Sequence, residues 1–424
     1  MRAASELTEE RSAAPGLGFP TLAGPATSPL GWPGIDAVSR ETVIEDAEPR
    51  PPATADEPEA FAQVPEVVTP TARTGATEDD RIPTTTVPPA PADRGDTTPE
   101  EHPTPVDDDV AERAQIAAAM PGADHHTPLA AAVAEDARKR ITLAGRSVPR
   151  PDRTRVLTVA NQKGGVGKTT TTVNIAAALA QAGSTVLVID LDPQGNASTA
   201  LGIEHHAEVP SVYDVLVEGT AIADVVQTCP DIARLWCVPA TIDLAGAEIE
   251  LVSLVARETR LEKAVHAFVD EREAAGERID YVLIDCPPSL GLLTVNAFVA
   301  ASEVFIPIQC EYYALEGLSQ LLKNIELIRN HLNKKLHVST ILLTMYDGRT
   351  RLSAQVADEV REHFPDQTLR ASVPRSVRIS EAPSHGQTVM TYDPNSSGAL
   401  SYLEAAVELA ERGVATRRTS EESA

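Results

Sequence analysis

The apolar positions of this chain gather after residue 155, where short aliphatic runs alternate with longer helix-length segments. Six runs of four to eight residues are rich in Val, Ile and Leu and predict strands at residues 156–160, 185–190, 235–238, 281–285, 304–308 and 338–345. Such continuously apolar runs are typical of parallel strands that are covered on both faces. Between them lie predicted helices at residues 169–182, 245–270, 290–301, 315–332 and 353–363. The alternation predicts an α/β fold with a doubly wound, mostly parallel sheet and ligands at the carboxyl ends of its strands.

Residues 1–150 show neither a strand nor a sustained helix period. They hold 21 of the 33 prolines, with 13 basic and 26 acidic residues, so they carry −13 of the total charge of −26. Such a composition cannot bury enough apolar surface to offset the entropy of ordering, which predicts a disordered, acidic Pro/Ala arm. The predicted organisation is this arm at 1–150, one folded domain at 151–413 and a polar tail at 414–424.

A basic hinge lies near the end of the arm. Residues 129–140 are locally helix-prone, and residues 138–155 carry seven basic side chains against one acid, Asp152. Two interpretations stay open for this hinge: a solvated linker, or an auxiliary contact to nucleic acid or another anionic surface.

Several classes of protein are disfavoured by composition. No apolar run approaches the roughly 20 residues of a membrane-spanning helix, and the N-terminus lacks an apolar signal core, which favours a cytoplasmic protein. The four cysteines contain no C-x-x-C pair, so neither a disulfide framework nor a zinc site is indicated. The acidic total argues against a uniformly basic nucleic-acid binder, although a local basic patch can still attract phosphates.

A glycine-rich loop follows the first predicted strand. Residues 161–170 read Asn-Gln-Lys-Gly-Gly-Val-Gly-Lys-Thr-Thr and precede a helix, as in phosphate-binding loops. The pattern G-x-x-x-x-G-K-[ST] is not met strictly, because Gln162 takes the place of its first glycine. Backbone N–H groups and a lysine would bind phosphates here, and Thr169 would bind Mg²⁺. The predicted nucleotide-binding residues are Lys163, Gly164, Gly165, Val166, Gly167, Lys168, Thr169 and Thr170.

Carboxylates end two further strands. Asp190 and Asp192 follow the second strand, and Asp285 ends the run 281–285. Phosphoryl transfer needs Mg²⁺ to neutralise charge and an oriented water, and acids at strand ends serve both needs. Asp192 is the candidate for water activation, with N-capping of the next helix as its structural alternative. Thr169, Asp190 and Asp285 are the candidate metal-site residues.

The loop Lys163-Gly-Gly-Val-Gly-Lys-Thr-Thr170 resembles the deviant Walker A loop of the ParA/MinD class of P-loop ATPases. The resemblance implies that Lys163 is a signature lysine that reaches the phosphates of a partner subunit across a nucleotide-sandwich dimer. Together with Lys168 and Asp192 it forms the predicted catalytic set. The runs 190–196 and 281–288 are similar to the Walker A′ and Walker B motifs of the class.

Later segments narrow the resemblance to chromosomal, Soj-like ParA proteins. They are residues 285–291, 306–318, 343–350 and 373–386. The family implies that the segment 306–318 contributes to nucleotide and dimer contacts. It also implies that Arg349, Arg375 and Arg378 bind DNA without sequence preference; a role for Arg351 stays open.

Other branches of the class fit the sequence less well. Residues 416–424 lack the apolar face of a MinD-type membrane tail, and the cysteines supply no paired ligands for an iron–sulfur cluster. Neither the membrane domain nor the tyrosine cluster of the related kinases is present. The Pro-rich N-terminal half does not resemble the helix-turn-helix domain of plasmid-type relatives.

The resemblance therefore implies an ATPase that uses ATP and Mg²⁺ and is slow without its partner. Such a protein dimerises on ATP, binds the nucleoid and is released after hydrolysis stimulated by a ParB-type centromere-binding protein. The alternatives are a scaffold that holds ATP and recruits a polar protein through its arm, or a MinD-like cell-division positioning protein.

Overall fold

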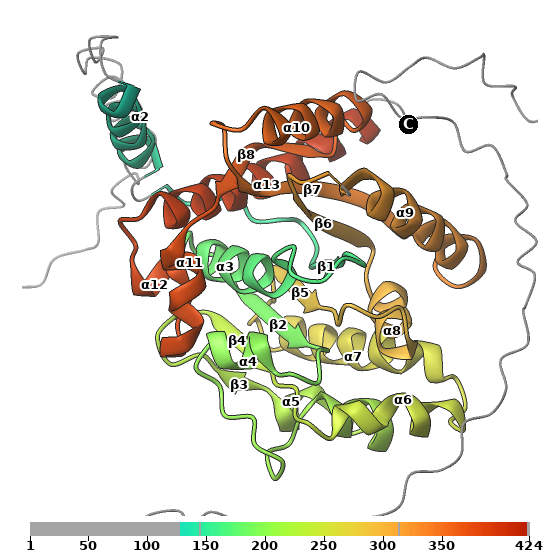
Figure 1. Ribbon diagram of the computed structural model, residues 1–424. Helices are drawn as coiled ribbons and strands as arrows, with labels where there is room; N and C mark the ends of the chain where they lie inside the picture. Colours follow the sequence, from blue (N-terminus) through green and yellow to red (C-terminus); the bar gives the residue numbers. More distant parts are fainter. Residues whose placement is uncertain (1–127, 144–145, 313, 422–424) are drawn as a thin grey trace, which may run out of the picture. The chain divides into compact units, whose positions relative to one another are not determined.

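One eight-stranded sheet forms the centre of the computed structural model, which describes residues 128–143, 146–312 and 314–421. The strand order is β3-β4-β2-β5-β1-β6-β7-β8 (Figure 1), and every neighbouring pair is parallel except β3 with β4. The strands are β1 (Arg155–Val159), β2 (Val186–Asp190), β3 (Gln227–Thr228), β4 (Leu235–Val238), β5 (Tyr281–Asp285), β6 (Glu303–Gln309), β7 (His337–Tyr346) and β8 (Thr368–Pro374). The predicted doubly wound, mostly parallel sheet is confirmed.

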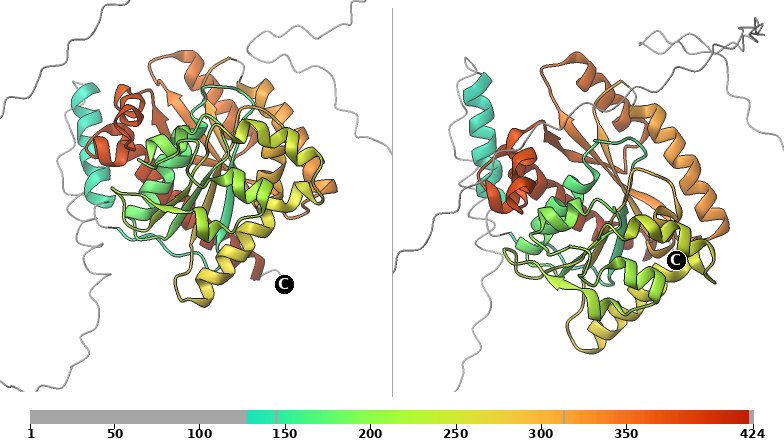
Figure 2. Two further views of the ribbon diagram at one scale, coloured as in Figure 1. Left: turned by 90° about the horizontal axis from the view of Figure 1, so that it is seen from below. Right: turned by 60° about the horizontal axis from the view of Figure 1, so that its bottom comes forward.

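Helices cover both faces of this sheet (Figure 2). The longer helices of the described residues are α2 (Pro128–Leu143), α3 (Lys168–Gln181), α6 (Leu244–Val252), α7 (Arg260–Ala274), α8 (Leu292–Ala300), α9 (Ala314–His331), α10 (Arg351–His363) and α13 (Ser397–Glu421). Shorter helical turns are α4 (Asn196–Ala200), η1 (Asp214–Glu218), α5 (Ile222–Val225), η2 (Arg257–Thr259), α11 (Val377–Glu381), η3 (Ala382–His385) and α12 (Val389–Tyr392).

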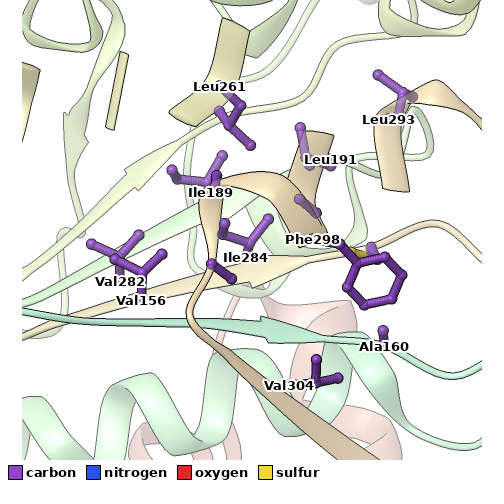
Figure 3. Close-up of a cluster of buried hydrophobic side chains, with 14 of the residues drawn as sticks. Val156, Ala160, Ile189, Leu191, Leu261, Val282, Ile284, Leu293, Phe298 and Val304 are labelled. Carbon is purple, nitrogen blue, oxygen red and sulfur yellow. The ribbon is translucent and has the colours of Figure 1, made fainter. Parts of the chain in front are cut away.

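The core consists of two apolar layers, one on each side of the sheet. Val156 and its neighbours on one face pack under α6 to α10, whereas Leu157 and its neighbours on the other face pack under α3, α4, α12 and α13. Figure 3 shows the first layer, in which Ile189 and Ile284 of the sheet lie beside Phe298 of α8. Both faces of each inner strand are thus buried, which explains why the sequence shows continuous rather than alternating apolar runs.

All six predicted strands are present, but the single helix predicted at 245–270 is wrong. The chain breaks between α6 and α7, where Ala256 adopts a left-handed conformation with φ of 54°. The side chain of Asn296 in α8 holds this break, since its amide donates to the carbonyl of Arg257 at 2.9 Å and its Oδ1 accepts from the N–H of Leu261 at 3.3 Å. A contact from a distant helix therefore overrides a continuous helical pattern.

The basic hinge packs onto the folded domain. Lys139 lies 3.3 Å from Glu404 of α13, and Arg146 pairs with Glu411 of the same helix. Leu143 and Val148 are buried in the core layer of α3 and α13. Residues 128–143 and 146–148 therefore contribute to the fold, although the folded domain was expected to begin only after residue 150. Intramolecular ion pairs neutralise part of the hinge's positive charge.

The structure describes the C-terminal end of the chain further than the N-terminal end. Residues 1–127 of the disordered arm predicted at 1–150 lie outside the described residues, and for them the expectation stays a prediction. At the other end, α13 continues through the expected tail to Glu421. None of the helices in the described ranges is both long enough and apolar enough to cross a membrane.

We predict that deleting residues 1–127 leaves the free energy of unfolding unchanged, whereas deleting residues 1–145 lowers it by about 1 to 3 kcal/mol. The second deletion removes Leu143 from the core together with the Lys139–Glu404 ion pair. Urea unfolding of the two truncated chains beside the full chain measures the difference. Equal stability of all three would show that α2 contributes nothing to the fold.

Candidate functional site

The glycine-rich loop connects β1 to α3 at the carboxyl edge of the sheet (Figure 1). Gly165 and Gly167 adopt φ of 73° and 87°, a region that side chains disfavour. Gly167 occupies the N-cap of α3, where no side chain accepts a hydrogen bond from the first turn. The N-terminal N–H groups of this 14-residue helix therefore point toward a site that suits an anion.

Neighbouring strands fix the shape of this loop. Asn161 donates through Nδ2 to the carbonyl of Pro307 in β6 at 2.8 Å, and its Oδ1 accepts from the N–H of Lys163 at 3.0 Å. The hydroxyl of Thr344 in β7 donates to the carbonyl of Val166 at 2.9 Å. Lys168, the first residue of α3, is only 7% exposed. Hydrogen bonds from β6 and β7 thus hold the glycine-rich loop in place.

Asp285 is a buried carboxylate with one unpartnered oxygen. Its Oδ1 accepts from the hydroxyl of Thr172 at 3.0 Å, whereas Oδ2 has no hydrogen-bond partner. Burial, together with the charge of Asp190, raises the pKa of Asp285 to about 8, although the hydroxyls of Thr169 and Thr172 act in the opposite direction. An orphaned carboxylate oxygen beside the Thr169 hydroxyl fits the oxygen ligands that Mg²⁺ prefers.

Asp190 lies beside Asp285, because the two residues are register partners in β2 and β5. Its Oδ1 accepts from the N–H of Asp192 at 3.1 Å, and its Oδ2 accepts from the N–H and the hydroxyl of Ser198 at 2.9 and 2.8 Å. Burial raises its pKa to about 6, while these hydrogen bonds lower it. The three bonds favour a role in positioning Asp192 and the start of α4 over direct contact with a metal.

Asp192 does not cap the next helix through its side chain. The N-cap of α4 is Gly195, with φ of 63° and no side-chain hydrogen bond. Oδ1 of Asp192 accepts instead from the N–H of Gln194 at 3.1 Å, and the residue is 9% exposed at the edge of the site. The alternative interpretation as an N-cap is therefore not observed.

Lys163 forms an ion pair with an acidic residue from another loop. Its Nζ lies 3.1 Å from Oε2 of Glu311, a residue that follows β6, and its side chain is 34% exposed. Glu311 lies in the segment 306–318 that the resemblance connects with nucleotide and dimer contacts, but nothing local marks it as the partner of a lysine 148 residues away. Nothing in the sequence marks Ser198, eight residues after Asp190, as the hydrogen-bond partner of that carboxylate. Thr172 carries a local signal, since it lies one helical turn after Thr169.

The three arginines expected to bind DNA follow β7 and β8, whose carboxyl ends adjoin in the sheet. Each is exposed and each is paired: Arg349 with Asp347 at 2.9 Å, Arg375 with Glu311 at 3.5 Å, and Arg378 with Glu381 at 3.2 Å. Exposed ion pairs of this kind contribute at most about 1 kcal/mol, so phosphates can compete for these guanidinium groups.

Among the described residues, the cysteines and the other potential metal ligands form no second site. All four cysteines are free and buried, and burial raises the pKa of Cys229 to about 12 and that of Cys310 to about 11, which keeps both thiols protonated. Over the parts of the chain that the structure describes, no three His, Cys, Asp or Glu side chains are grouped to hold a metal ion. Asp285 would therefore share a metal with phosphate oxygens and water, as Mg²⁺ commonly does.

Comparison with known proteins identifies close sequence relatives. A family model described as an AAA domain matches residues 154–338. The chain is 51% identical over 259 residues to the sporulation initiation inhibitor protein Soj of Bacillus subtilis, covering 61% of this chain and 99% of that protein. It is 50% identical over 259 residues to the chromosome partitioning protein ParA of Caulobacter vibrioides, covering 61% of this chain and 94% of that protein.

Solved structures share the architecture. A protein described as cobyrinic acid a,c-diamide synthase from Mycobacterium smegmatis, with bound ADP and magnesium, is 37% identical with a TM-score of 0.51, covering 60% of this chain and 92% of that chain. The apo structure of McdA from Cyanothece is 21% identical with a TM-score of 0.52, covering 60% and 100%, which shows the fold alone.

The buried carboxylate predicts a pH-dependent stability difference between wild type and Asp285→Asn. In the unfolded chain an Asp ionises near pH 4, whereas Asp285 in the folded chain ionises only near pH 8. The ionisation of Asp285 therefore lowers the stability of wild type as the pH rises from 4 to 8, by at most roughly 1 kcal/mol per pH unit, and contributes no further loss above 8. The variant lacks this loss, so its stability relative to wild type should grow from pH 5 to pH 8.

Urea unfolding at several pH values, without nucleotide and with a metal chelator, measures this difference. Asp231→Asn, on the surface, is the matched control, since it removes the same charge. A stability difference between Asp285→Asn and wild type that is constant with pH would contradict the assigned burial effect.

Proposed function

Since the chain belongs to the ParA/Soj family of chromosome-partitioning ATPases, we propose that it is a nucleotide-switched partitioning protein. It binds ATP and Mg²⁺ at residues 163–170, dimerises in that state, binds DNA without sequence preference, and is released on hydrolysis. The observation that carries this proposal is the orphaned oxygen of Asp285 beside the N-terminus of α3, with Lys168 and Thr169 on the same edge. Anion and cation subsites thus adjoin.

Different residues bind the phosphates, hold the metal ion and orient the attacking water. Backbone N–H groups of the loop and the ammonium of Lys168 bind the phosphates, and Thr169 and Asp285 hold Mg²⁺. The metal, when bound, neutralises negative charge on the phosphate oxygens. Asp192 orients the attacking water, and Asp190 fixes Asp192 through its backbone N–H. The products are ADP and inorganic phosphate.

Lys163 acts between subunits in this proposal. It lies in the loop yet pairs with Glu311, and a third of its side chain is exposed. A partly exposed lysine that is held only by an ion pair can reach the nucleotide of a second copy once that pair breaks. Dimerisation would then depend on bound ATP rather than on a permanent interface.

DNA binding would use the arginines that follow β7 and β8. Arg349, Arg375 and Arg378 are between 56% and 90% exposed along their side chains, and phosphate contacts of this kind carry no base information. The protein would therefore associate with the nucleoid as a whole. A ParB-type centromere-binding protein would stimulate hydrolysis and so release the dimer. An arm at residues 1–127 could in addition recruit a polar scaffold protein.

Alanine substitutions at three site residues should have different effects on ATP binding and dimerisation. Lys168→Ala should lose ATP affinity by at least about tenfold, because it removes a charge-assisted phosphate contact. Asp192→Ala should bind ATP and accumulate as a dimer, since water activation is lost while the sandwich is kept. Lys163→Ala should bind nucleotide and stay monomeric.

Size-exclusion chromatography with light scattering, with ATP and Mg²⁺, decides between these outcomes. Lys323→Ala, an exposed lysine of α9, is the matched control for the loss of one positive charge. A Lys163→Ala protein that dimerises like wild type would remove the role of this lysine between subunits.

A second prediction concerns the salt dependence of DNA binding. If the ATP dimer neutralises about six phosphates, the logarithm of its affinity should fall with the logarithm of salt concentration with a slope near −5. Arg375→Ala or Arg378→Ala should each reduce that slope by up to about 2, equally on unrelated DNA sequences.

Fluorescence anisotropy over a salt series measures the slope. The double variant Arg329→Ala/Arg361→Ala, which changes exposed arginines of α9 and α10, is the control for net charge. Wild-type affinity and slope in Arg375→Ala/Arg378→Ala, with dimerisation intact, would exclude these arginines from the DNA-binding surface.

A further inference from the structure

One carboxylate connects the nucleotide loop with an arginine of the proposed DNA-binding surface. Oε2 of Glu311 lies 3.1 Å from Nζ of Lys163, and Oε1 lies 3.5 Å from Nη2 of Arg375. The side-chain amide of Gln309 also donates to Oε1. Each oxygen of Glu311 thus holds one cation, and a neutral donor from the end of β6 orients the carboxylate.

The three residues come from loops that follow different strands. Lys163 lies after β1, Glu311 after β6 and Arg375 after β8. Only the folded sheet brings them together, because 148 residues separate Lys163 from Glu311. The contact therefore spans from the phosphate loop to the edge of the sheet.

The surroundings of Arg375 add a second negative charge. Asp347 follows β7, and hydrogen bonds from Arg349, assisted by the charge of Arg375, lower the pKa of Asp347 to about 2. Arg375 thus lies within the field of two carboxylates, Glu311 and Asp347. In the nucleotide-free monomer its charge is partly neutralised toward any approaching phosphate.

We propose that Glu311 is an inhibitory contact that restrains Lys163 and Arg375 in the nucleotide-free protein. This inference rests on the proposed function, because it assumes that Lys163 acts on the nucleotide of a second copy and that Arg375 binds DNA. Lys163 must leave Glu311 before it reaches a phosphate elsewhere, and DNA phosphates must compete with Glu311 for Arg375. Both steps are opposed by the same side chain.

The strength of the contact suits a switch. The side chains of Lys163, Glu311 and Arg375 are 34%, 46% and 66% exposed, so water screens both ion pairs. Pairs of this kind shift an equilibrium by up to about fivefold. Such a contact restrains the free monomer, yet charge-assisted bonds to phosphate are strong enough to displace it.

Glu311→Gln tests the proposal, because the amide keeps an oxygen that can accept from Gln309 but loses the charge. We expect the ATP concentration for half-maximal dimerisation to fall about two- to fivefold. Light scattering over an ATP series at fixed protein and Mg²⁺ measures this shift. Glu381→Gln is the matched control: it removes one negative charge beside Arg378, without any contact to Lys163 in the described residues, and should leave the midpoint unchanged.

The second arm of the experiment measures binding to a random-sequence duplex DNA without nucleotide at low salt. Glu311→Gln should bind about two- to fivefold more tightly than wild type. In the Arg375→Ala background the same substitution should give a clearly smaller gain, because the released arginine is then absent.

The wild-type result in both assays distinguishes a failure of the proposed function from a failure of the inhibitory contact alone. Wild type that fails to dimerise with ATP contradicts the proposed function itself. If wild type dimerises but Glu311→Gln has the wild-type midpoint and DNA affinity, only the inhibitory contact is overturned. A shift of the dimerisation midpoint in Glu381→Gln equal to that in Glu311→Gln would also overturn it, since the effect would then be one of net charge.

Discussion

The register of the three central strands is the constraint on which the site depends. β5 pairs with β2 on one side and with β1 on the other, so Asp285 has Asp190 as its partner in one strand and Val159 in the other. Parallel strands end at the same edge, and the chain continues from Val159 directly into the glycine-rich loop. The glycine-rich loop and two buried acids therefore lie together at this edge because of the strand register alone.

This arrangement buries two carboxyl groups, and burial disfavours their ionised forms. Asp190 is satisfied by three hydrogen bonds, whereas one oxygen of Asp285 has no partner, and burial raises the pKa of both. The free energy lost by burying an uncompensated carboxylate is recovered when a cation approaches it. The unpartnered oxygen thus makes metal binding and the stability of the site interdependent.

Local sequence patterns were sufficient to predict the central strands and the glycine-rich loop. They were not sufficient to predict the side-chain contacts between loops. Continuous apolar runs predicted every central strand, and glycine, lysine and threonine spacing located the phosphate loop. β8 escaped prediction because an edge strand is only partly buried and its sequence is mixed, and the break before Arg260 depends on Asn296 of another helix. Pairings such as Lys163 with Glu311 exist only after the sheet has formed. No spacing in the sequence reports them.

We infer that nucleotide binding in this protein serves a cycle of ATP turnover rather than a static scaffold. The most direct test is the rate of phosphate release from ATP by the full chain, measured alone, with DNA, with a ParB-type protein, and with both. We expect hydrolysis to be slow for the chain alone, to rise severalfold when DNA and the ParB-type protein are both present, and to be lost in Asp192→Ala. Tight ATP binding with no hydrolysis under any of these conditions would contradict this inference.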